Sequence, residues 1–112
     1  MVSYKPERGD LIWIDFDPQA GHEKGGRRPA IVLSGGIYNR RTGLAIVCPI
    51  TSRAKGYPFE VALPDGLPIS GVVLADQVKN IDCIARRSEL ISTAPESVLS
   101  EVHRKLDSLF IS

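Results

Sequence analysis

Hydrophobic and polar positions alternate with a period of two along the first part of the chain. In "DLIWIDFDP" the residues of one face are apolar, and Trp13, Asp15 and Asp17 lie on the other, which is typical of a half-buried strand. Turn residues separate six segments with strand-like patterns: 10–18, 29–34, 44–50, 59–63, 71–79 and 80–87. Short strands at this spacing predict a mainly β fold, a small barrel or sandwich, rather than alternating strands and helices.

The last part of the chain changes to a helical period. Thr93 and Glu96 stand at the spacing of a capping box, and Pro95 falls in the predicted first turn. An apolar stripe follows at helical spacing: Val98, Leu99, Val102, Leu106, Leu109 and Phe110. The pattern predicts one C-terminal helix that packs on the barrel. A shorter helical turn is indicated at 36–41, and residues 1–112 form a single predicted domain.

The composition narrows the class of protein. The chain is 43% hydrophobic and 24% charged, as in ordinary soluble globular proteins. It contains no run of about 18 apolar residues and no apolar N-terminal signal segment, so we expect no membrane partner and a cytoplasmic location. Cys48 and Cys83 lie in apolar strand-like runs, which predicts two reduced, buried thiols.

The net charge of +1 conceals an asymmetry along the chain. Between His22 and Lys55 there are seven basic residues and one acidic residue, so this segment carries +6 and the remainder −5. A segment this basic suggests a polyanionic partner on one face, although a solvated surface with clustered charge is the alternative.

Metal and cofactor sites find little support in the sequence. Asp15 and Asp17 lie about 7 Å apart on one strand face, but nothing nearby completes a cation site. His22 and His103 lack the spacing of metal ligands. The glycines match neither a Walker loop nor a dinucleotide fingerprint, and no serine stands in a nucleophile elbow. We therefore expect no metal and no cofactor.

Polar residues at predicted strand ends remain as candidates for chemistry: Arg28, Thr51, Ser52, Asp76 and Gln77. If neighbouring strands pair there, a guanidinium, a hydroxyl and an amide converge beside the basic segment 22–27. A guanidinium clamps two phosphoryl oxygens of a phosphodiester while a hydroxyl donates to a third. RNA brings its own nucleophile, the 2′-hydroxyl. Spacing alone leaves a structural alternative open, in which these groups cap strands and turns.

Five motifs resemble the MazF/PemK family of toxin endoribonucleases, in the same order and with similar gaps: "GDLIWIDFDP", "GHEKGGRRPAIVLS", "CPITS", "KGYPFEV" and "GVVLADQVKNI". The resemblance runs from about Gly9 to Arg87 and continues more loosely through the helix. It implies an SH3-like barrel of about six or seven strands with a C-terminal helix, usually a homodimer. It also implies metal-independent cleavage of single-stranded RNA to 2′,3′-cyclic phosphate and 5′-hydroxyl ends, and neutralisation by a cognate antitoxin.

The resemblance also implies catalytic residues. Arg28 matches an arginine that acts on the scissile phosphate, and Thr51 matches the threonine after the "P-x-T" strand. Glu23, His22 and Asp76 match acid or base candidates from two branches of the family, and the general base stays open among them. The plasmid-borne branch has an arginine where this chain has Leu74, so Arg28 is expected to contribute more to catalysis.

Recognition residues are predicted around this centre. Tyr38, Asn39, Gln77 and Lys79 are expected to read bases, with Arg27, Arg53 and Lys55 on phosphates. Trp13 faces away from the core side of its strand and is expected to anchor a dimer or antitoxin interface, or else to cover a second small core. Cys83 and Ile84 replace an aromatic and a basic residue found in several relatives.

Two rival functions share the barrel and the basic face. One is a non-catalytic SH3-like module that binds RNA or protein, and the other is a gyrase poison of related fold. The joint presence of Arg28 and Thr51 favours the nuclease, because a binding module does not need both groups.

Overall fold

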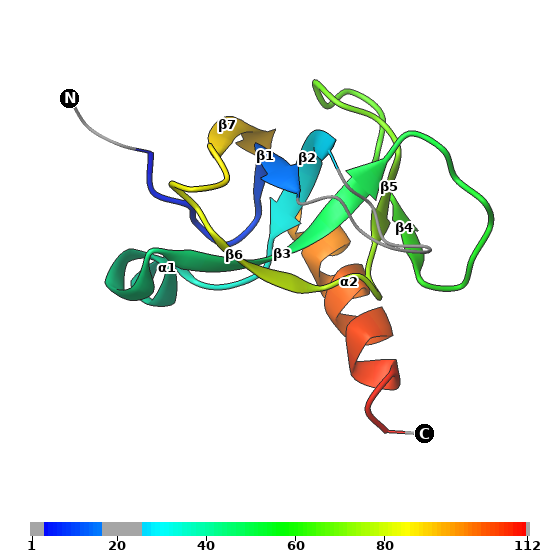
Figure 1. Ribbon diagram of the computed structural model, residues 1–112. Helices are drawn as coiled ribbons and strands as arrows, with labels where there is room; N and C mark the ends of the chain where they lie inside the picture. Colours follow the sequence, from blue (N-terminus) through cyan, green and yellow to red (C-terminus); the bar gives the residue numbers. More distant parts are fainter. Residues whose placement is uncertain (1–3, 17–25, 112) are drawn as a thin grey trace.

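The computed structural model describes residues 4–16 and 26–111, and within them the chain forms seven strands and two helices (Figure 1). The elements in chain order are β1 (Asp10–Phe16), β2 (Gly26–Val32), α1 (Gly36–Thr42), β3 (Leu44–Thr51), β4 (Glu60–Ala62), β5 (Val72–Leu74), β6 (Lys79–Asp82), β7 (Glu89–Thr93) and α2 (Glu96–Ser108). The mainly β class, the C-terminal helix and the short helix near residue 36 are as predicted.

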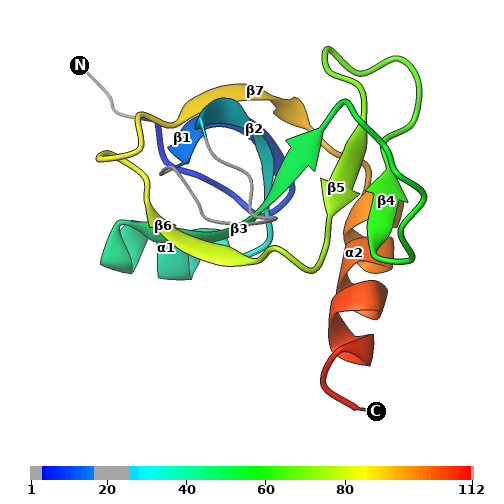
Figure 2. The same cartoon turned by 45° about the vertical axis from the view of Figure 1, so that its right-hand side comes forward.

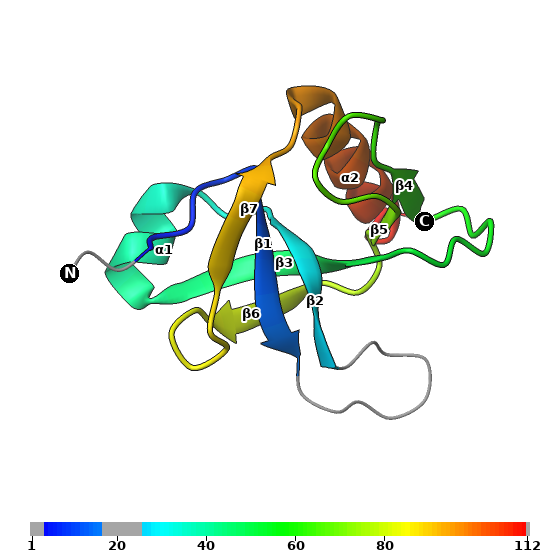
Figure 3. The ribbon, with the colours of Figure 1, turned by 90° about the horizontal axis from the view of Figure 1, so that it is seen from above.

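The strands pair antiparallel in the order β4-β5-β3-β2-β1-β7, and β6 also pairs with β3. β7, β1, β2, β3 and β6 follow one another around a ring in Figure 2. Seen from above, β1 and β2 cross over β3, while α2 lies beside β4 and β5 (Figure 3). The sheet therefore curves into a small barrel with a helical side layer.

Two hydrophobic clusters fill this architecture. The first lies within the ring and contains the inward face of β1, namely Ile12, Ile14 and Phe16, as its period-two pattern predicted. The second lies between the other face of the sheet and α2, where Leu11 and Ile31 meet Leu99 and Val102. β1 and β2 thus contribute to both clusters, which explains why the apolar run of β2 is nearly continuous.

Both cysteines are buried and free, as predicted. Cys83 belongs to the cluster inside the ring, and Cys48 to the cluster under α2. Burial raises the pKa of the Cys48 thiol to about 12, with a smaller contribution from the negative charge of Asp76. The Cys48 thiol is therefore neutral near pH 7.

The predicted start of the C-terminal helix is wrong. α2 begins at Glu96 after Pro95, and no side chain caps it. Thr93 belongs to β7 and pairs with Asp10, so strand pairing rather than helix capping determines its position. The helix also ends at Ser108, and Phe110 of the predicted apolar stripe is 78% exposed.

Candidate functional site

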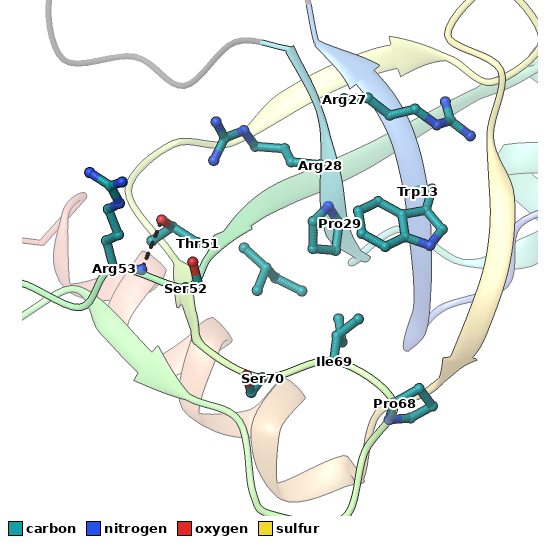
Figure 4. A pocket seen from close by; sticks show the side chains of 11 residues that line it. Trp13, Arg27, Arg28, Pro29, Thr51, Ser52, Arg53, Pro68, Ile69 and Ser70 are labelled. Carbon is teal, nitrogen blue, oxygen red and sulfur yellow. Dashed lines mark hydrogen bonds between the residues drawn. The ribbon is translucent and has the colours of Figure 1, made fainter.

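A pocket of about 740 Å³ lies where the ends of β2 and β3 meet residues 68–70 (Figure 4). Its polar side chains are Arg27, Arg28, Thr51, Ser52, Arg53 and Ser70. Its apolar side chains are Trp13, Pro29, Ile50, Pro68 and Ile69. Ligand pockets in proteins usually measure about 300–1,000 Å³, so this one has room for a small molecule or one unit of a polymer.

The pocket exists because β2 and β3 separate at their ends. They pair over residues 30–32 of β2, after which β3 takes β5 as its neighbour while the start of β2 stays on β1. Pro29 and Pro49 stand at the point of separation, where a residue without an N–H cannot extend the hydrogen-bond ladder. Continuing the register would set Arg28 opposite Thr51, and these side chains lie on either side of the gap (Figure 4).

Arg28 is held by β1 rather than by a loop. The sequence predicted that this strand begins at residue 29, but β2 begins at Gly26 because the end of β1 gives residues 26–28 a partner. Arg28 pairs with Ile14 and is half-buried at the pocket. A strand backbone fixes its Cα, so the guanidinium reaches the pocket from a defined position.

Thr51 ends β3 and is only 6% exposed. Its hydroxyl oxygen accepts a hydrogen bond from the backbone N–H of Arg53 at 3.2 Å. A hydroxyl that accepts one bond still carries its own hydrogen for donation. The guanidinium of Arg28 and the hydroxyl of Thr51 therefore meet at one pocket, as expected, and Ser52 lines the same pocket.

Gly71 holds the opposite wall close to Thr51. Its φ is +130°, and a Cβ at this position would lie 2.2 Å from the carbonyl oxygen of Thr51. No other residue fits there without moving the backbone that carries Thr51. Sequence reasoning missed this wall, because the Gly/Pro-rich segment before β5 indicated only a turn.

Arg27 belongs to a cluster of ion pairs beside the pocket. Its Nη1 donates to Asp15 Oδ1 at 2.9 Å, and its Nη2 donates to Glu89 Oε1 at 2.5 Å and to the backbone oxygen of Arg87 at 3.0 Å. Arg87 Nε donates to the other oxygen of Asp15 at 2.6 Å. Hydrogen bonds from Arg87 and Arg27 lower the pKa of the Asp15 carboxyl to about 2.

These contacts revise two expectations about this face. Arg27 was predicted on RNA phosphates, but its guanidinium is committed to two carboxylates and a carbonyl. Asp15, which was weighed as half of a cation site with Asp17, is instead the shared acceptor of two arginines. Asp17 lies outside the described residues.

Asn39 does not fit its predicted role in base recognition. It is 2% exposed, its Nδ2 donates to the backbone oxygens of Pro6 and Ser34, and its Oδ1 accepts from the Ser34 hydroxyl at 2.5 Å. Its amide therefore fastens α1 to the N-terminal segment. Tyr38 is 38% exposed, and its hydroxyl accepts a hydrogen bond from Asn80 at 2.8 Å.

Asp76 and Gln77 do not line the pocket. β5 is antiparallel to β3, with Val72 opposite Thr51, so the chain moves away from Thr51 as it approaches Asp76. This pocket therefore does not include the two side chains that were expected beside Arg28. Lys79 begins β6, opposite Val47 of β3. His22 and Glu23 lie outside the described residues.

The segment after Thr51 carries two exposed basic residues, Arg53 and Lys55. Arg53 lines the pocket (Figure 4). The backbone N–H groups of Lys55 and Gly56 donate to the Glu60 carboxylate at 2.9 and 3.0 Å, which folds the segment back on β4. Both side chains remain candidates for phosphate contacts.

The three departures from the family pattern have different structural settings. Leu74 is 5% exposed on β5 and contributes apolar burial where the plasmid-borne branch carries an arginine. Cys83 is buried in the cluster inside the ring. Ile84 is 76% exposed in the turn between β6 and β7.

The described ranges contain no group of three or more metal-ligating side chains placed to hold an ion. Within the same residues, neither helix is long and apolar enough to cross a lipid bilayer.

Comparison with known proteins identifies the family. The family described as "PemK-like, MazF-like toxin of type II toxin-antitoxin system" matches residues 7–110. The chain belongs to this family. It is 48% identical to "Endoribonuclease toxin MazF" of Escherichia coli (strain K12) over 110 residues, which are 97% of this chain and 98% of that protein. The family that the five sequence motifs indicated is thus confirmed.

Solved structures agree with this assignment. MazF (Form-I) from Deinococcus radiodurans is 59% identical, with a TM-score of 0.92, and the match covers 96% of this chain and 97% of that one. The MazE-MazF (Form-II) structure from the same organism gives 52% identity and a TM-score of 0.86, covering 97% of this chain and 98% of that one. The MazF-like fold expected from the sequence is confirmed.

Proposed function

We propose that this endoribonuclease toxin cleaves single-stranded RNA, without a metal ion, by attack of the 2′-hydroxyl on the adjacent phosphate. The observation that carries the proposal is the pair formed by Arg28 and Thr51 across the gap between β2 and β3. Family membership supports it, since MazF of Escherichia coli is an endoribonuclease.

In the proposed reaction the 2′-oxygen forms a bond to phosphorus while the bond from phosphorus to the 5′-oxygen breaks. A general base takes the proton of the 2′-hydroxyl, and the departing 5′-oxygen takes a proton from an acid. The products are a 2′,3′-cyclic phosphate and a 5′-hydroxyl. No other reactant is required, because the substrate supplies its own nucleophile.

Arg28 and Thr51 stabilise the charge that develops on phosphorus oxygens. A guanidinium stays protonated at all relevant pH values, so Arg28 binds two oxygens of the pentacoordinate phosphorane. The departing 5′-oxygen is a stronger base than a neutral guanidine, so Arg28 is also its proposed proton donor and regains a proton from solvent. The Thr51 hydroxyl donates to a third oxygen.

We assign the general base to His22 on chemical grounds. The reference pKa of a histidine side chain, about 6.5, suits proton transfer near neutral pH, whereas an ordinary carboxylate is a weaker base at that pH. The position of Asp76 outside the pocket also favours His22 over it. A His22→Ala variant is expected to lose the acidic limb of the pH–rate profile.

Phosphates and bases beyond the cleavage point are proposed to contact a wider basic face. Arg53 and Lys55 follow Thr51, and Gln77 and Lys79 lie at the start of β6. The Tyr38 hydroxyl of α1 accepts a hydrogen bond from Asn80 of β6. Exposed cations serve phosphates, and Tyr38 offers a ring for stacking.

We also propose that this chain acts as a homodimer and binds a cognate antitoxin. The solved MazE-MazF structures from Deinococcus radiodurans support an antitoxin partner. Light scattering of the purified chain, alone and with the product of any adjacent antitoxin gene, tests both statements. A monomer at micromolar concentration contradicts the first, and unchanged RNA cleavage with excess antitoxin contradicts the second.

The central test incubates the protein in EDTA with a mixed-sequence single-stranded RNA and with its DNA counterpart. We expect cleavage of the RNA alone, with 2′,3′-cyclic phosphate ends detected by mass spectrometry. Arg28→Ala and Thr51→Ala should lose this activity. Arg104→Ala is the matched control, because Arg104 pairs with Glu101 on α2 and does not line the pocket. Normal cleavage by both pocket variants would contradict the assignment of Arg28 and Thr51. Inhibition of gyrase without RNA cleavage would contradict the nuclease function and favour a gyrase poison.

A further inference from the structure

The pocket beside Arg28 and Thr51 has a second, apolar side that the proposed chemistry does not use. Trp13 forms this side together with Pro29, Pro68 and Ile69 (Figure 4). Trp13 is 37% exposed, although β1 is otherwise well covered. It is also the single tryptophan of the chain.

The exposure of Trp13 follows from its place on the outward face of β1. On that face, Leu11 is fully buried in the cluster under α2, and Asp15 is half-buried and forms ion pairs with two arginines. Trp13 lies between these two positions, opposite Pro29 of β2. It lines the pocket, as Ile69 and Pro68 do (Figure 4).

The shape and charge of the pocket suit one building block of a nucleic acid. Of the described side chains that line it, none is acidic and three are arginines, of which Arg27 is engaged in ion pairs with Asp15 and Glu89. Its polar side offers donors to a phosphate, and its apolar side offers an indole ring and aliphatic surface. When Arg28 binds a phosphate of an RNA chain, the nucleobases on either side of that phosphate lie within one nucleotide of it. Aromatic side chains bind such bases by stacking.

We propose that Trp13, with Pro29 and Ile69, holds the nucleobase next to the scissile phosphate. The proposal rests on the proposed function, because it takes Arg28 and Thr51 as the phosphate site. It gives Trp13 a different role from the two that the sequence suggested, an anchor of a dimer or antitoxin interface or a cover of a second small core. Stacking depends on ring area more than on hydrogen-bonding edges, so purines bind this subsite more tightly than pyrimidines.

The first experiment pairs protein variants with modified substrates. After the cleavage site is mapped, an abasic residue replaces the base on the 5′ or the 3′ side of the scissile phosphate. One of these two substitutions should lower kcat/KM of the wild type by roughly ten- to hundred-fold. On intact RNA, Trp13→Leu should lower kcat/KM by the same factor. On that abasic RNA, Trp13→Leu and the wild type should have the same kcat/KM. The kcat/KM of Trp13→Phe should stay within a few-fold of the wild-type value. Phe110 is a 78% exposed aromatic residue outside the pocket, so the control variant Phe110→Leu should have the wild-type kcat/KM.

A second experiment measures base contact without cleavage. The fluorescence of Trp13 is followed while a mixed-sequence single-stranded DNA, which lacks the 2′-hydroxyl, is titrated. We expect quenching by this DNA and none by an abasic sugar-phosphate strand of the same length. This measurement stands even if no RNA is cleaved, so failure of the base subsite is distinguishable from failure of the nuclease function.

Three results would overturn the base subsite. In the first, Trp13→Leu cuts intact RNA as well as the wild type does. In the second, the decreases in kcat/KM caused by Trp13→Leu and by the abasic residue multiply when the two are combined, as expected for independent effects. Alternatively, Trp13→Leu could change the mass measured by light scattering while abasic substitutions have no effect, which would assign Trp13 to a contact between copies.

Discussion

Two neighbouring arginines on β2 have different surroundings. Arg27 faces outward, where two carboxylates and a backbone carbonyl accept hydrogen bonds from its guanidinium. Arg28 is on the other face of the strand, opposite Ile14, and reaches the gap between β2 and β3. The sequence "RR" makes them look equivalent, but successive side chains in a strand point to opposite faces.

The basic segment thus contains one arginine engaged in ion pairs and one that is half-buried at the pocket. The start of β2 is paired with β1, and the ion pairs of Arg27 attach it to β7 and to the turn before β7. Arg27 therefore positions the strand that carries Arg28. A positioning role and a phosphate contact respond differently to substitution, and the largest difference is expected at the two guanidinium groups themselves.

Lysine substitutions at the two positions should separate them most clearly. Arg28→Lys keeps the charge but loses the two-pronged donor geometry, so we expect kcat to fall by about 10²–10³-fold. Arg27→Lys should lower kcat by only a few-fold, because the ammonium still reaches one carboxylate. Single-turnover cleavage of one mapped RNA measures both. Equal losses at the two positions would show that the arginines share one role.

The salt dependence of RNA binding should change at one position only. A cation that contacts a single-strand phosphate contributes about 0.7 to the slope of log K against log salt. Arg28→Ala should reduce the slope by roughly this amount, measured with an uncleavable DNA copy. Arg27→Ala should leave the slope unchanged and weaken cleavage by a few-fold. A reduced slope for Arg27→Ala would restore its predicted phosphate contact.

Asp15→Asn should imitate Arg27→Ala without removing a positive charge. The substitution removes the carboxylate that Arg27 and Arg87 share, so the end of β2 loses the same attachment. We expect a loss of cleavage of a few-fold, with the KM for RNA nearly unchanged. Glu101→Gln, on α2 outside the pocket, is the control. If Arg27 instead binds RNA, Asp15→Asn should bind it more tightly.

Acid should weaken the ion-pair cluster in a defined pH window. The pKa of Asp15 falls from an ordinary 3.8 to about 2 in the folded chain, so its stabilising effect is complete above pH 4 or so and is lost as the pH falls toward 2. Melting temperatures of wild type and Asp15→Asn should differ at pH 6 and converge near pH 2. A constant difference across this range would show that the carboxylate charge does not stabilise the fold.

Local periodicity sufficed for most of the barrel. β1 alternates because one of its faces lies inside the ring, and that signal is written in consecutive residues. β7 was missed because it lies at the end of the pairing order, where Leu90 is 54% exposed and the alternation is weak. The predicted capping box failed for a related reason, since Thr93 is paired with Asp10 from the other end of the chain.

The sequence alone determined the family, the mainly β fold, and the pairing of Arg28 with Thr51 as the candidate centre. These three conclusions depend on residue types and on their spacing along the chain, which can be read without knowing the fold. Only the tertiary structure decided that Arg27 is engaged in ion pairs, that Asn39 is buried, that Asp76 lies outside the pocket, and that Trp13 lines it. Each of these depends on partners brought together by strand pairing between distant segments, and hydrogen bonds and burial exist only once those segments meet.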